Sequence, residues 1–174
     1  EIMINQRKTI VECGGGISTV LIAKLINEFS GKLYTIEHSK EWAVFLENLL
    51  KKYKLNQNVY IIYSPLRQIE LSIGKGFWYE CKCIERVIPR KKVDFLIVDG
   101  PPSYPIENKY SRYFAVPFFW DYFAEDFSIL LDDINRQGEK EIITLWEKEY
   151  NIKFKRYYID GGVAVYRRKE EFAI

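Results

Sequence analysis

Polar side chains stand at the ends of the apolar segments that the sequence predicts to be buried strands. These residues are Glu12, Glu37, Ser64, Asp99 and the pair Asp132-Asp133. In an open parallel sheet, ligands bind beyond the carboxyl ends of the strands. One acid at such an end means little, because loops are polar. Four acidic ends in one chain, with glycines after the first, indicate a binding site at this edge of the sheet.

A turn rich in glycine follows the first of these acids, in the segment E-C-G-G-G-I-S-T. Glycine lets a ligand approach the backbone closely, so we expect Gly14 and Gly16 to contact one. Glu37 follows Gly14 by 23 residues, a spacing at which an acid accepts the ribose hydroxyls of NAD or S-adenosylmethionine alike. The dinucleotide fingerprint is incomplete, because Thr19 replaces its third glycine. Glu12, before the glycines, suits an ammonium group better than a pyrophosphate.

Five apolar segments alternate with helical patterns. The predicted strands are Thr9–Cys13, Leu33–Glu37, Val59–Tyr63, Val93–Val98 and Phe127–Leu131. The predicted helices are 18–27, Glu41–Tyr53, Tyr110–Phe123 with an interruption near Pro117, and Gln137–Tyr150. Ser18 or Thr19 could cap the first helix. This order predicts a parallel sheet with helices on both faces.

The chain closes with two apolar stretches, Phe154–Ile159 and Val163–Tyr166, on either side of a glycine pair. Such a turn predicts an antiparallel hairpin. The expected fold is therefore a doubly wound, mostly parallel α/β sheet with a C-terminal hairpin, in a single domain over residues 1–174. Ser72–Lys92 fits neither helix nor strand, and we expect an excursion that could cover the site. Because a strand follows Glu1 almost at once, we expect residues upstream of it.

The composition is that of a soluble globular domain, with 48% hydrophobic and 29% charged residues. The formal net charge is only +2, and the basic residues are spread along the chain, which argues against nucleic-acid binding. No apolar run approaches the roughly 20 residues of a membrane span. Cys13, Cys81 and Cys83 match neither a disulfide framework nor a structural zinc site. We therefore expect reduced thiols and a cytoplasmic protein.

The sequence resembles the class I S-adenosylmethionine-dependent methyltransferases, and more closely a bacterial branch related to the small-molecule O-methyltransferases. The resemblance is carried by E-C-G-G-G-I-S-T, Y-T-I-E-H, Trp42, V-D-F-L-I-V-D-G-P-P and I-L-L-D-D-I-N-R-Q-G-E. It implies a Rossmann-like seven-stranded sheet with its last strand reversed, and S-adenosylmethionine as cofactor. The residues expected to bind this cofactor are Glu12, Gly14, Gly16 and Ser18 at the methionine part, Glu37 at the ribose, His38, Pro65 and Leu66 around the adenine, and Asp99.

Asp99, Asp132 and Asp133 are the candidate catalytic residues. A hydroxyl acceptor needs a base, or a metal that lowers its pKa. Catechol-type O-methyltransferases hold Mg²⁺ with an acid after the fourth strand and an Asp-Asn pair after the fifth, so the resemblance implies that these three residues could hold Mg²⁺. The segment G-P-P after Asp99 departs from that pattern. Asp133 could instead cap the next helix, and Asp99 could act alone as a base.

We predict a methyltransferase that modifies a hydroxyl of a small molecule or a glycan precursor. The alternatives are a non-catalytic nucleotide-binding domain of the same fold and an NAD-dependent oxidoreductase. The aromatic-rich segment Tyr104–Phe123 is expected to pack mainly in the core, with Tyr104–Tyr113 near the acceptor. Arg112 could meet an anionic acceptor or pair with a strand-end acid, and Trp78-Tyr79 could form a lid or an anchor.

Overall fold

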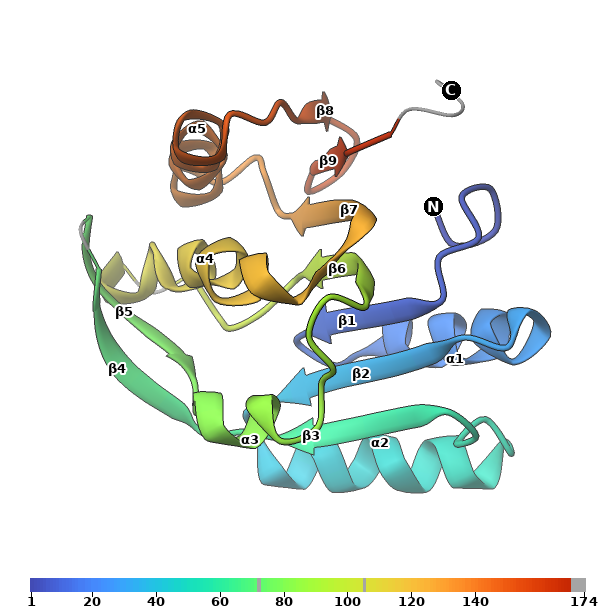
Figure 1. The fold of residues 1–174 in the computed structure, drawn as a ribbon. Helices are drawn as coiled ribbons and strands as arrows, with labels where there is room; N and C mark the ends of the chain where they lie inside the picture. Colours follow the sequence, from blue (N-terminus) through green and yellow to red (C-terminus); the bar gives the residue numbers. More distant parts are fainter. Residues whose placement is uncertain (72, 105, 170–174) are drawn as a thin grey trace.

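A seven-stranded sheet forms the centre of the computed structural model, which describes residues 1–71, 73–104 and 106–169 (Figure 1). The strands lie in the order β3-β2-β1-β6-β7-β9-β8. Those that run parallel are β1 (Thr9–Cys13), β2 (Lys32–Glu37), β3 (Val59–Tyr63), β6 (Val93–Val98) and β7 (Phe123–Asp132). The hairpin of β8 (Lys155–Tyr157) and β9 (Val163–Arg167) closes the sheet, with β9 antiparallel to β7. The predicted fold is confirmed.

Helices cover both faces of the sheet because successive residues of its strands point to opposite sides. On one face, Ile10 and Leu33 pack against α1 (Ile17–Phe29). On the other face, Val11 belongs to the larger core that includes α5 (Gln137–Tyr150). The helix α2 (Lys40–Lys52) connects β2 to β3. Among the described residues, no helix is long and apolar enough to cross a membrane.

The segment after β3 differs from its prediction. It forms a second, two-stranded antiparallel sheet of β4 (Leu66–Leu71) and β5 (Gly74–Tyr79), followed by α3 (Cys81–Glu85). The expectation that Ser72–Lys92 lacks regular structure was therefore wrong, although Ser72 itself lies outside the described residues. Two glycines in β5 made the strand look like a loop, since glycine weakens strand preference. Figure 1 shows this hairpin on the side to which β1, β2 and β6 point.

The predicted helix Tyr110–Phe123 was also only partly right. A 3-10 turn η1 (Ile106–Asn108) precedes three short elements, which are η2 (Ser111–Phe114), α4 (Ala115–Phe119) and η3 (Trp120–Tyr122). Phe123 already belongs to β7, whose register against β6 shifts between Val93 and Phe95. The aromatic side chains of this region pack in the core, as expected for most of them.

The first helix begins earlier than predicted and has a different cap. Gly16 occupies the N-cap position of α1, and its N–H donates to Thr19 Oγ1 at 3.0 Å. Ser18 and Thr19 lie in the first turn, and their hydroxyls donate to Glu12 instead of capping the helix. The two hydroxyls bond Glu12 because its carboxylate is buried, and a buried carboxylate needs hydrogen-bond donors more than the exposed end of a helix does.

Candidate functional site

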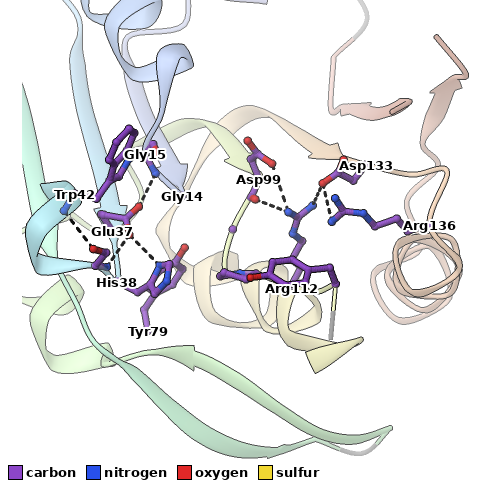
Figure 2. Close-up of a pocket in the computed structure, with 14 residues that line it drawn as sticks. Gly14, Gly15, Glu37, His38, Trp42, Tyr79, Asp99, Arg112, Asp133 and Arg136 are labelled. Atoms are coloured by element: carbon purple, nitrogen blue, oxygen red, sulfur yellow. Dashed lines mark hydrogen bonds and ion pairs between the residues drawn. The ribbon is translucent and has the colours of Figure 1, made fainter. Parts of the chain in front are cut away.

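A cavity of about 410 Å³ lies beyond the carboxyl ends of β1, β2 and β6 (Figure 2). From β1 the chain adds β2 and β3 on one side and then β6 and β7 on the other side, so the strand order switches between β1 and β6. Ligands bind at this switch point in doubly wound folds. The volume falls within the range of about 300–1,000 Å³ that is typical of small-molecule sites. The lining residues are Gly14, Gly15, Glu37, His38, Ser39, Trp42, Tyr79, Asp99, Gly100, Pro102, Tyr104, Arg112, Asp133 and Arg136.

Two glycines meet at the floor of this cavity. Gly14 has a φ of +89°, and a Cβ built on it would lie 3.0 Å from the backbone nitrogen of Gly100. A Cβ on Gly100 would lie 2.8 Å from Gly14 Cα. Side chains at either position would therefore collide with backbone. The close approach of β1 and β6 at this point requires glycine, and it leaves open backbone for a ligand.

The Glu37 carboxylate forms the wall beside the glycine turn. Its Oε2 accepts from the Gly15 N–H at 3.1 Å, and its Oε1 accepts from the Ser39 N–H at 2.7 Å. His38 Nδ1 lies 2.9 Å from the same Oε1. Burial raises the pKa of Glu37, but these hydrogen bonds outweigh it and hold the pKa below its usual value. Glu37 is therefore an ionised acceptor at the end of β2.

Trp42 closes the same half of the cavity. Its indole Nε1 donates to the Gly15 carbonyl oxygen at 2.8 Å, and its ring stacks on Phe45 with 4.9 Å between centroids. The Ser39 hydroxyl caps α2 by accepting from the Trp42 N–H, and this bond fixes the backbone from which the Trp42 side chain extends. The hydrogen bond ties the turn after β1 to the first turn of α2. Hydrogen bonds within the protein therefore define the half of the cavity around Glu37.

Glu12 lies beneath the glycine turn and does not line the cavity. It is fully buried, and its oxygens accept from the hydroxyls of Ser18 at 2.6 Å, Thr19 at 2.6 Å and Thr35 at 2.8 Å. Burial raises its pKa, which these hydrogen bonds partly oppose. Pairing of β1 with β2 sets Glu12 opposite Thr35. These hydrogen bonds tie the end of β1 to the first turn of α1 and to β2.

Several other predicted cofactor residues also lie outside the lining. Gly16 has extended backbone, and a Cβ there would meet only Ser18 Oγ at 3.8 Å. Pro65 and Leu66 lie at the start of the β4–β5 hairpin, where Leu66 pairs with Tyr79. The hairpin instead contributes Tyr79 to the cavity. This residue was noticed in the sequence only as a possible lid or anchor.

The opposite half of the cavity carries acids and arginines (Figure 2). Asp99 directly follows β6, and its side chain is 45% exposed. Arg112 Nη2 lies 3.4 Å from Asp99 Oδ1, and Arg112 Nη1 lies 3.1 Å from Asp133 Oδ2. Arg136 Nη1 contacts the same Asp133 oxygen at 2.9 Å. The expectation that Arg112 pairs with a strand-end acid is confirmed.

The pKa of Asp99 is raised to about 6, chiefly by burial. Arg112 and Arg136 oppose this shift, and the neighbouring carboxylates of Asp132 and Asp133 contribute to it. A carboxylate that titrates near neutral pH and faces a cleft can accept a proton in catalysis. Arg136 and Tyr104, at the rim of this half, also line a second cavity that continues over the start of α5.

Asp132 and Asp133 differ in position. Asp133 lines the cavity, whereas Asp132 does not and accepts from the Asp133 N–H through its Oδ1 at 2.8 Å. Asp133 does not cap the following helix, since Arg136 occupies the N-cap position of α5. Its carboxylate is committed to the two guanidinium groups instead.

The acids do not fit a divalent metal site. Among residues 1–71, 73–104 and 106–169, no three His, Cys, Asp or Glu side chains are grouped to hold an ion. The Arg112 guanidinium lies between Asp99 and Asp133, at the position where an ion would have to bridge them. Mg²⁺ demands near-octahedral oxygen coordination, which a guanidinium between the ligands prevents.

Comparison with known proteins agrees with this geometry. A family described as "Methyltransferase domain" matches residues 11–134, well over half of the chain. No curated protein sequence matches the chain. A methyltransferase from Podospora anserina, solved with SAH bound, has a TM-score of 0.73 and 16% identity over 97% of this chain and 74% of its own.

Two further solved structures share the fold. An O-methyltransferase from Bacillus cereus, in complex with SAH, has a TM-score of 0.70 and 17% identity, covering 96% of this chain and 77% of its own. A precorrin-6y C5,15-methyltransferase from Geobacter metallireducens has a TM-score of 0.63 and 11% identity, and the match covers 92% of this chain and 79% of its own. At such identities the similarity shows the shared fold alone.

Proposed function

Since the chain belongs to the methyltransferase-domain family, we propose that it binds S-adenosylmethionine in the cavity beyond β1 and β2 and methylates an oxygen of a small molecule or glycan precursor. The observation that carries this proposal is the juxtaposition of Gly14 and Glu37 in one cavity. Two structures of the same fold were solved with SAH, the product of this donor. The family match gives no support to the oxidoreductase alternative.

The half of the cavity around Glu37 fits the nucleoside of the donor. The Glu37 carboxylate uses three hydrogen bonds to protein groups, and a carboxylate offers about four lone-pair sites. At least one site therefore remains for a ribose hydroxyl. His38 and Trp42 would flank the adenine, and the open backbone at Gly14 would meet the methionine part. Pro65 and Leu66, at the start of the β4–β5 hairpin, do not line the cavity, whereas Tyr79 at the end of the same hairpin does.

The half around Asp99 fits the acceptor. S-adenosylmethionine supplies an electrophilic methyl carbon, and in-line transfer requires the acceptor oxygen to be held behind it. We assign Asp99 as the base that takes the acceptor's hydroxyl proton while the new carbon–oxygen bond forms and the carbon–sulfur bond breaks. Asp133 holds Arg112 and Arg136 at this end, and Asp132 orients the Asp133 backbone.

The proposal is tested first by ligand binding. S-adenosylhomocysteine should raise the melting temperature of the protein, while NAD and NADP should not, because only a ligand of the native state stabilises it. Transfer of a labelled methyl group then separates an enzyme from a non-catalytic binding domain. Stabilisation by NAD alone would refute the assignment of the cavity.

A matched pair of variants locates the site. Glu37→Gln keeps the shape of the side chain and removes its charge, so the affinity for S-adenosylhomocysteine should fall by about 1.5–3 kcal/mol, or about 10- to 150-fold. Glu41→Gln makes the same change four residues away, on an exposed side chain of α2 outside the cavity, and should leave the affinity unchanged. Equal affinities of the two variants by calorimetry would place the ribose elsewhere.

A further inference from the structure

The Arg112 guanidinium is the centre of the polar network at the acceptor end. Its side chain is only 4% exposed. It contacts Asp99 Oδ1 at 3.4 Å, Asp133 Oδ2 at 3.1 Å and Glu139 Oε1 at 3.6 Å. Its N–H groups also donate to the backbone oxygens of Asp99, Pro101 and Asp132. Arg112 therefore joins the ends of β6 and β7 to the start of α5.

These contacts give the acids a counter-ion that belongs to the protein. A guanidinium cannot lose its proton in a protein, so its charge is permanent. Five donors in a planar fork let it hold several oxygens at once, as the contacts with two strand ends show. A divalent ion between the same acids would lie within a few ångströms of this charge and be repelled by it.

We infer that Arg112 replaces a divalent metal at the acceptor end of the site, so that methyl transfer by this chain needs no metal and depends on Arg112 to position Asp99. This inference rests on the proposed function only for the part that concerns methyl transfer. The part that concerns the cation can be tested on the protein without any reaction.

The geometry gives Arg112 a defined task. Its contact holds Oδ1 of Asp99, and among the described residues no hydrogen bond is seen to Asp99 Oδ2. One oxygen is thus fixed by the protein and the other is left for the acceptor hydroxyl. Arg112 does not touch the reacting atoms in this arrangement. It is a positioning residue, and it acts through Asp99.

In the first experiment, the wild-type protein is titrated with Mn²⁺ and binding is measured by calorimetry. We expect no saturable binding at millimolar Mn²⁺. In labelled methyl transfer, we expect the same rate with EDTA and with added Mg²⁺. Saturable Mn²⁺ binding that disappears in Asp99→Asn would overturn the inference, and so would activity that EDTA abolishes and Mg²⁺ restores.

The second experiment removes the resident cation. Arg112→Met removes the guanidinium that Asp99, Asp133 and Glu139 share, and Asp133 keeps only its ion pair with Arg136, so this variant should gain Mn²⁺ binding that the wild type lacks. Arg156→Met is the control, because Arg156 is likewise paired with an acid, Glu147 at 2.7 Å, but lies in β8 and does not line the cavity. The control should gain no Mn²⁺ binding. Equal Mn²⁺ binding by the two variants would contradict the inference.

A third variant remains informative if Arg112→Met does not fold. Arg112→Lys keeps the charge but cannot bridge Asp99 and Asp133 as a fork does. We expect its kcat to fall at least tenfold while its KM for S-adenosylmethionine stays the same. An unchanged kcat, or a loss confined to KM, would show that Arg112 does not position Asp99. If no variant and no wild-type protein binds S-adenosylhomocysteine, the proposed function fails, while the Mn²⁺ titration still decides the question of the cation.

Discussion

Protonation of Asp99 should switch off methyl transfer below neutral pH. The pKa of this carboxyl is raised to about 6 by burial and by the nearby carboxylates of Asp132 and Asp133, against the opposing effect of Arg112 and Arg136. The base must be ionised to take a proton from the acceptor. With a pKa of about 6, the ionised form outnumbers the protonated form about tenfold at pH 7, and the ratio is reversed at pH 5.

The expected magnitude follows from these ratios. The rate constant kcat/KM should fall about tenfold between pH 7 and pH 5 and change little above pH 7. Asp99→Asn removes the base, so its plateau rate should be about 10²- to 10⁴-fold lower and its profile flat in this range. The control is Asp121→Asn, because the Asp121 side chain is 80% exposed and lies at the surface, where it pairs with Arg90.

The assay is transfer of a labelled methyl group, measured from about pH 5 to pH 8. Binding of S-adenosylhomocysteine is measured at each pH, so that a loss of donor binding is not mistaken for a loss of the base. A wild-type profile that stays flat from pH 5 to pH 7 would refute the assignment. So would an Asp99→Asn variant that keeps both the rate and the pH profile of the wild type.

Two further predictions concern the glycine turn. Thr35→Val removes one hydroxyl from the buried Glu12 carboxylate, and the free energy of unfolding in urea should fall by about 1–3 kcal/mol; no loss would mean that the carboxylate does not depend on this bond. Trp42→Phe removes the hydrogen bond to Gly15, so the affinity for S-adenosylhomocysteine should fall by about 0.5–1.5 kcal/mol, and most of the change in tryptophan fluorescence on binding should disappear with it. A variant that binds as tightly as the wild type would show that the indole is not needed.

The main features of the fold were predictable because their signals are local. Each parallel strand is a short apolar run, and the strands alternate with helical patterns, which together specify a doubly wound sheet. The glycine pair before Val163 marks the closing hairpin. Gly14 and Glu37 were found for a similar reason. A turn after a buried strand and an acid at the end of the next strand can both be read from neighbouring residues.

The β4–β5 hairpin was missed because its sequence carries no such signal. Apolar residues do not alternate along Leu66–Leu71, and Gly74–Tyr79 begins with two glycines within three residues. The strands are specified by their pairing and by the packing of Trp78, which is fully buried against Phe114. Strand preference depends on such neighbours more than on the residues themselves.

The residues after the strands were visible in the sequence, but their environments were not. Glu12 and Glu37 both end strands, yet one carboxylate lies beneath the turn among hydroxyls and the other lines the cavity. Strand pairing decides this, because it sets Glu12 opposite Thr35. Likewise, the three acids at two strand ends were visible in the sequence, but their ion pairs with Arg112 were not. The sequence alone determined which chemical groups reach this edge of the sheet, since that depends on local patterns. Only the tertiary structure decided which charges meet there, because Arg112 and Asp133 lie 21 residues apart in the chain and form their ion pair only in the folded protein.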